Sequence, residues 1–117
     1  RLDLSSGELR DLVNETVDYL LFEDEVALPA PVQGVTGFAR AFAERGPRDR
    51  RGRSLRELDL RTRLFRYRCS YMIYSPAFDA LPAAARTAVY ARMLQILSSR
   101  GDHEVMAILD DTRKGWR

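Results

Sequence analysis

The chain has 117 residues, of which 45% are hydrophobic and 31% charged, and its formal net charge is +2. These values are typical of one globular domain that buries a core without disulfides or metals. The single cysteine excludes an internal disulfide and a multi-cysteine metal site, and no apolar run reaches the roughly 18 residues of a membrane span. We therefore expect residues 1–117 to form one domain. Because Arg1 stands in place of an initiator methionine, we also expect this domain to be part of a longer protein.

The first predicted element is an amphipathic helix over residues 7–22. Ser5 and Glu8 have the spacing of a capping box, in which the hydroxyl accepts from a helical amide and the carboxylate reaches back. Apolar residues recur at helical spacing on one face, and acidic residues occupy the other. A proline-rich connection follows this helix.

A second, short helix is predicted over residues 37–45. Thr36 is placed to cap it, and Phe38 and Phe42 are expected to be buried. A Gly-Pro pair then ends it. The next stretch, RGPRDRRGR at residues 45–53, is polar and has no periodicity, so we expect a loop.

The longest predicted element is a central helix over roughly residues 55–74. Ser54 and Glu57 repeat the capping-box spacing, and Pro76 terminates the segment. On a helical wheel this segment is apolar on two opposite faces, which is typical of a helix packed between neighbours. The two faces consist of Leu58, Thr62, Phe65, Cys69 and Met72, and of Leu60, Leu64, Tyr67, Tyr71 and Tyr74.

An alternative interpretation of the same segment is a strand. Aromatic and branched residues alternate with arginine and other residues from Phe65 to Tyr74, and such residues favour strands. We prefer the helix because the wheel pattern covers more residues than the alternation does.

Two further helices complete the predicted fold. After a turn or short helix at residues 76–80, the chain is expected to be helical from Pro82 to about Ser99. Asp102 is placed to cap a last helix that ends near Gly115. The sequence therefore predicts an all-α domain, with about five helices in one compact bundle around the central helix.

Residues suited to catalysis or metal binding are few. His103 is the only histidine, and it lies in the first turn of the last predicted helix, where it is expected to be exposed. Cys69 lies on an apolar face and is expected to be an inert core thiol. We therefore predict no catalytic residue, no metal site and no cofactor, and a chain that is not an enzyme unless it completes a composite site in a larger protein.

Charge is distributed unevenly along the chain. Eight acidic residues lie between Asp3 and Glu25, and ten arginines lie between Arg45 and Arg68. The basic segment is a candidate surface for nucleic acid or another polyanion. Equally, its arginines can pair with the acidic first helix of the same fold, or extend along a buried helix with their charged ends in water. The candidate polyanion contacts are Arg48, Arg50, Arg51, Arg53 and Arg56.

Three stretches resemble the C-terminal region of a family of uncharacterised bacterial proteins. They are RGPRD…GRSLRELDLRTRLFRYRCSYMIYSPAFDALP at residues 45–82, DYLLFEDEVALP within residues 16–29, and AILDDTRK at residues 107–114. The resemblance covers most of the chain and implies that this is the C-terminal part of a longer, exported protein. It carries no activity, cofactor or catalytic residue. It also implies a proline in relatives at the position of Arg68, which would break the central helix near Tyr67.

The function that the sequence favours is docking to a protein partner or to the rest of the parent chain. The central helix has more apolar surface than one neighbour can cover, and a tryptophan lies near the C-terminus. The expected contact residues are the basic segment together with Tyr67, Tyr71, Tyr74 and Trp116. The alternative is polyanion binding through residues 45–56.

Overall fold

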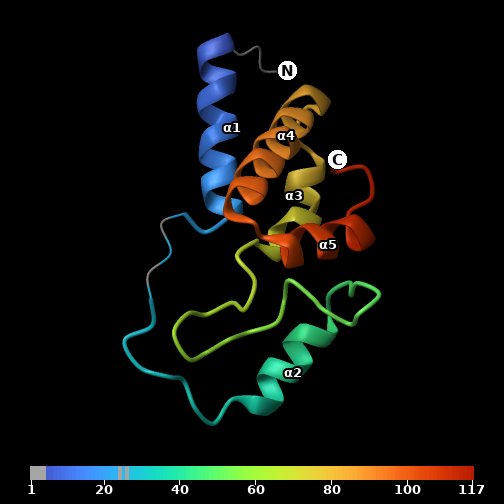
Figure 1. The fold of residues 1–117 in the computed structure, drawn as a ribbon. Helices are drawn as coiled ribbons and strands as arrows, with labels where there is room; N and C mark the ends of the chain where they lie inside the picture. Colours follow the sequence, from blue (N-terminus) through green and yellow to red (C-terminus); the bar gives the residue numbers. More distant parts are fainter. Residues whose placement is uncertain (1–4, 24, 26) are drawn as a thin grey trace.

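The fold is described by a computed structural model over residues 5–23, 25 and 27–117 (Figure 1). Within this part of the chain the structure contains helices and connecting loops but no β-strand. The elements are α1 (Ser6–Leu20), α2 (Thr36–Glu44), the 3₁₀ helix η1 (Tyr71–Tyr74), α3 (Pro76–Asp79), α4 (Ala83–Arg100) and α5 (His103–Thr112). The predicted all-α fold with about five helices is confirmed. None of these helices is long and apolar enough to cross a bilayer.

Helices α1, α4 and α5 form the core together with the segment that precedes α3. Helix α1 packs along α4, and α4 packs on α5 (Figure 1). Each helix presents branched or flexible apolar residues at helical spacing, so one stripe of each is removed from water. The buried stripes are Val13, Val17 and Leu20 of α1, Val89, Met93 and Leu97 of α4, and Val105, Ile108 and Leu109 of α5.

The helix ends follow the capping signals of the sequence. At α1 the Glu8 amide donates to the Ser5 hydroxyl over 3.1 Å, and the Ser5 amide donates to the Glu8 carboxylate over 3.0 Å. Helix α4 ends at Gly101, whose φ of +66° an L side chain rarely adopts. The Asp102 carboxylate then accepts from the Val105 amide and begins α5. The capping box and the Asp102 cap are therefore confirmed, although α5 ends at Thr112 rather than near Gly115.

The predicted central helix over residues 55–74 is wrong. Residues 55–70 are turns, bends and irregular backbone, and only residues 71–74 form a 3₁₀ helix. The Glu57 carboxylate does accept from the Ser54 amide, at 2.8 Å, but the Ser54 hydroxyl accepts from the amide of Arg56 instead of Glu57. The capping pair thus closes a local turn. Leu60 then has φ +64°, a left-handed conformation that no right-handed helix contains.

A hairpin loop at residues 57–66 takes the place of the central helix. Arg66 donates its amide to the Glu57 carbonyl at 3.0 Å, and the amide of Leu60 donates to the Arg63 carbonyl at 2.9 Å. One isolated antiparallel bridge pairs Leu58 with Phe65, so the alternative strand prediction is not confirmed either. Burial follows the alternation only from Tyr67 to Cys69, because Ser70 is buried as well and Tyr71 is only half-buried.

Helix α2 lies apart from the bundle, at the far end of the long connections (Figure 1). It contributes no buried residue, and Thr36 does not cap it, since Val35 is the N-cap residue and makes no side-chain hydrogen bond. The expected burial of Phe38 is wrong, because 63% of this side chain is exposed. Phe42 is half-buried and provides the aromatic contact between α2 and the rest of the fold.

Candidate docking groove

An open groove of about 660 Å³ lies where the end of α1 meets the hairpin loop and the start of η1. We call it the aromatic groove. It is lined by Glu15, Asp18, Tyr19, Phe22, Glu25, Leu64, Phe65, Ser70, Tyr71 and Met72. Its volume is in the range of ligand and peptide pockets, and most of its walls are aromatic or aliphatic. Tyr19 is 63% exposed and Leu64 46% exposed, so large apolar side chains on two of its walls contact water.

The walls are positioned by backbone contacts between segments that are far apart in the sequence. The amide of Ser70 donates to the Leu20 carbonyl over 2.7 Å, which ties the start of η1 to the end of α1. Phe22, with φ +55°, turns the chain out of α1, and its ring stacks on Phe65 with centroids 5.5 Å apart. Tyr71 lies next to Phe65, with ring centroids 6.0 Å apart. The groove therefore has a fixed aromatic floor.

Arg56 supports this floor from behind. Its guanidinium lies over the ring of Phe42 at 3.8 Å and over the ring of Tyr71 at 4.6 Å. Its Nε also donates to the Phe42 carbonyl at 2.7 Å. A cation between two rings is attracted to the negative face of each, so Arg56 joins α2 to the groove wall. Arg56, which was predicted to contact a polyanion, therefore makes its contacts within the fold.

The rim of the groove is acidic. Glu15, Asp18 and Glu25 line it, and no arginine, lysine or histidine does. Glu25 lies 3.5 Å from the guanidinium of Arg63, whereas Glu15 and Asp18 make no ion pair within the part of the chain that the structure describes. Two exposed carboxylates beside an apolar floor produce a negative potential at the mouth of the groove.

The basic loop at residues 47–53 is organised by one buried carboxylate, that of Asp49, which is 6% exposed. Burial acts to raise the pKa of Asp49. Hydrogen bonds from the amides of Arg53 and Arg51 and from the Arg53 guanidinium, at 2.7 to 2.9 Å, outweigh burial, and the pKa is lowered. Arg48 donates to the Gly52 carbonyl at 2.9 Å. The prediction of a loop is confirmed, but this loop has its own internal hydrogen bonds.

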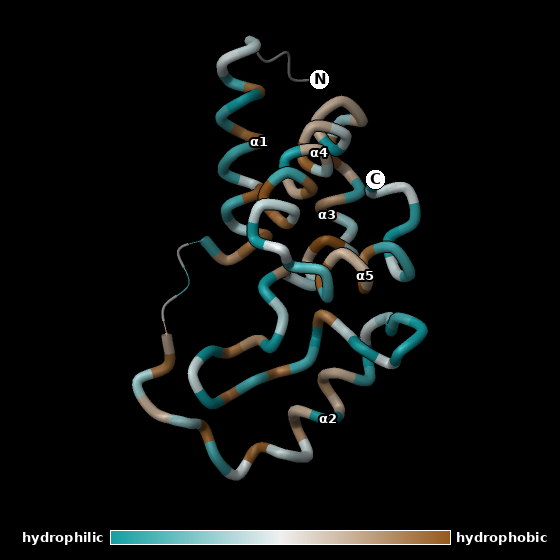
Figure 2. Tube along the Cα trace, in the orientation of Figure 1, coloured by the Kyte–Doolittle hydropathy of each residue, from teal (hydrophilic) through white to brown (hydrophobic). Residues whose placement is uncertain are grey.

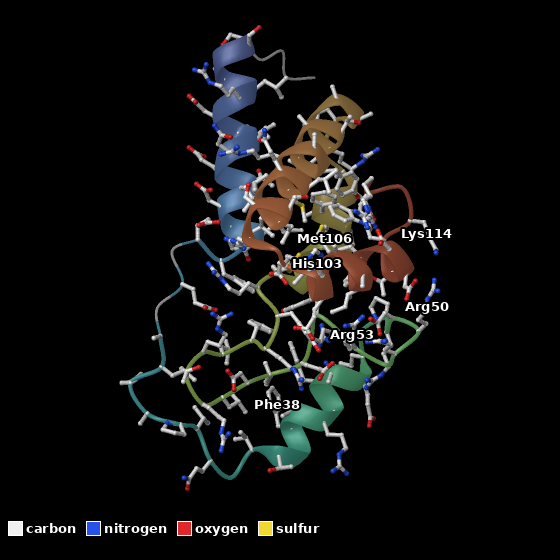
Figure 3. All side chains as sticks on the ribbon, viewed as in Figure 1. Phe38, Arg50, Arg53, His103, Met106 and Lys114 are labelled. Carbon is white, nitrogen blue, oxygen red and sulfur yellow. The ribbon has the colours of Figure 1, made fainter. Side chains whose placement is uncertain are left out.

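Further acids neutralise the same loop from α5. Arg50 pairs with both carboxylate oxygens of Asp111, and its amide also donates to this carboxylate. These hydrogen bonds lower the pKa of Asp111. Arg53 lies 3.9 Å from Glu104. Figure 3 shows Arg50 and Arg53 between the loop and α5, and the tube of this loop is mostly hydrophilic in Figure 2. Arg50 and Arg53 therefore pair with acids of the same fold, but these acids lie in the loop itself and in α5 rather than in α1.

Two predicted contact residues lie in the core. Tyr67 is 5% exposed and Trp116 is 3% exposed. The indole of Trp116 donates to the Asp110 carboxylate at 2.9 Å, which fixes the last residues against α5. Tyr74 is half-buried, with its hydroxyl 2.6 Å from that of Thr112. Of the predicted tyrosine surface, Tyr71 lies at the groove.

The residues considered for chemistry, Cys69 and His103, do not line the groove. Cys69 is fully buried, and this burial raises the pKa of its thiol to about 12. His103 is exposed at the first turn of α5 (Figure 3). In the described residues, no three His, Cys, Asp or Glu side chains are grouped as metal ligands.

Sequence patterns pointed to some walls of the groove but not to the groove itself. Tyr71 was expected at an interaction surface and Leu64 on a face of the central helix, while Tyr19 and Phe22 fell within the first predicted helix with no contact assigned to them. The signal that could have found Tyr19 and Phe22 is the presence of aromatic residues on both sides of the proline-rich connection. The chain matches no protein-family model, no curated protein and no solved structure.

Proposed function

We propose that this chain is a non-catalytic docking domain whose aromatic groove binds a basic, amphipathic segment of a protein. The observation that supports this function is an apolar groove of about 660 Å³ with an acidic rim and exposed Tyr19 and Leu64 on its walls. An apolar side chain of the partner would be removed from water on the aromatic floor. A basic side chain of the same segment would reach Glu15 or Asp18.

The competing function, polyanion binding, has weaker support. Arg50, Arg53 and Arg56 each contact an acid or an aromatic ring of the same chain, and these contacts would have to be exchanged for phosphate contacts. Arg45, Arg48 and Arg51 are exposed and make no ion pair within the described residues, but three arginines neutralise few phosphates, and affinity depends on that number.

Fluorescence anisotropy tests the proposed function. The probe is a fluorescein-labelled amphipathic peptide of leucine, alanine and arginine, and its control is the same peptide with glutamate at the arginine positions. We expect the basic peptide to bind more tightly, and Tyr19→Ser or Leu64→Ser to weaken binding about tenfold. Val32→Ser is the matched control, since Val32 is 43% exposed and does not line the groove. Equal binding by all three variants would contradict the proposal.

A further inference from the structure

Helix α2 presents an exposed aromatic side chain of the kind that the aromatic groove would bind. No residue of α2 is buried, and Phe38 and Tyr19 are, at 63%, the most exposed large apolar side chains in the described residues. Tyr19 lines the groove, and Phe38 belongs to α2, which lies outside the bundle core (Figures 1 and 3). Phe38 is stacked on Phe42, with centroids 5.8 Å apart, so it is held in place while exposed.

The charges of the two surfaces are complementary. Arg45, just after α2, is seven residues from Phe38 and therefore on the same side of the helix, and it is exposed and makes no ion pair within the described residues. Arg40 is exposed too, but it lies two residues from Phe38 and so on the opposite face. The groove offers Glu15 and Asp18 and no basic lining residue. Opposite charges around an apolar anchor favour one orientation of a helix in the groove.

The groove and α2 also lie on one continuous strip of aromatic rings. Phe22 stacks on Phe65 at 5.5 Å, Phe65 lies 6.3 Å from Phe42, and Phe42 stacks on Phe38. A two-fold symmetric contact needs a surface that carries both complementary parts of the contact. This strip carries both, so a two-fold axis across its middle places each α2 over the groove of the other copy.

We propose that the segment bound in the aromatic groove is α2 of a second copy of this chain, with Phe38 as the apolar anchor. This inference rests on the proposed docking function and names its partner. It makes the domain a reciprocal dimer with two identical α2–groove contacts.

Sedimentation equilibrium of the full chain over a range of protein concentrations tests this inference. We expect a reversible dimer that weakens as salt is raised, because exposed charges contribute to the contact. Phe38→Ser and Tyr19→Ser should each raise the dissociation constant by about tenfold or more, while Val32→Ser leaves it unchanged. All three side chains are exposed, so circular dichroism and the thermal transition should remain those of the wild type.

A mixture of two variants distinguishes the proposed dimer from non-specific association. The Phe38→Ser copy retains a groove and the Tyr19→Ser copy retains α2, so their heterodimer has one intact contact while each homodimer has none. The mixture should therefore associate more tightly than either variant alone. Monomers at all concentrations, or a dimer that both variants leave intact, would overturn the inference. If the monomer still bound the basic peptide, the docking function would survive and only the identity of the partner would be wrong.

Discussion

Replacement of Leu60 by glycine and by alanine tests the turn that stands in place of the central helix. Leu60 has φ +64°, where an L side chain costs about 1 kcal/mol and glycine costs nothing. Both replacements remove the leucine side chain, so its lost packing cancels in the comparison. We expect Leu60→Gly to be more stable than Leu60→Ala by about 1 kcal/mol, or about 4 °C in Tm.

Urea unfolding followed by the fluorescence of the single tryptophan, Trp116, measures this difference, because Trp116 is buried in the fold. A helix at Leu60 would reverse the order, since glycine is about 1 kcal/mol worse than alanine in a helix interior. Leu60→Ala being the more stable variant would therefore refute the turn. Ala91→Gly, at an exposed position of α4, is the control and should cost about 1 kcal/mol.

Three further predictions concern the loop, the α2 contact and the thiol. Asp49→Asn should lower the free energy of unfolding by about 2 kcal/mol at pH 7. Because the pKa of Asp49 is lowered in the native state, the wild type should lose this advantage as the pH falls below about 4. If the variant lost as much stability in acid as the wild type, the prediction would be contradicted. Gly46→Ala places a Cβ 2.4 Å from the Arg56 Cδ and should cost about 1 kcal/mol in a thermal melt, whereas Gly37→Ala meets no atom within 4 Å and should not destabilise. Cys69 should react with a disulfide reagent only as fast as the fold opens; rapid reaction of the native protein would show that the thiol is accessible.

The helices that sequence patterns predicted correctly have local causes. The capping box at Ser5 and Glu8, the Asp102 cap and the left-handed Gly101 involve residues within one or two helical turns. Their hydrogen bonds form inside the same short segment, so the sequence alone contains the information.

The segment from Ser54 to Tyr74 was predicted wrongly because its local signals fit two structures. The side chains of Ser54 and Glu57 can accept hydrogen bonds from nearby backbone amides in a turn as well as at the start of a helix. Two apolar faces fit a buried helix as well as a buried extended chain. Contacts from elsewhere decide between them: the Val32 amide donates to the Leu60 carbonyl at 2.7 Å, and the Ser70 amide to the Leu20 carbonyl. Such long-range pairings override local propensity.

The groove could not be predicted for the same reason. Its floor depends on Phe22 meeting Phe65, and on Arg56 lying between the rings of Phe42 and Tyr71. None of these pairs is adjacent in the sequence. The buried positions of Tyr67 and Trp116 likewise follow from packing against distant elements, which periodicity does not report.

Mapping of amide chemical shifts is the most direct test of the aromatic groove as the docking site. The full chain, labelled with ¹⁵N, is titrated with the unlabelled basic amphipathic peptide. The proposed function predicts that the shifts concentrate in residues 15–25 and 64–72, which contain the groove lining. Shifts confined to residues 47–53 and 103–111, or no shifts while the protein remains folded, would contradict it.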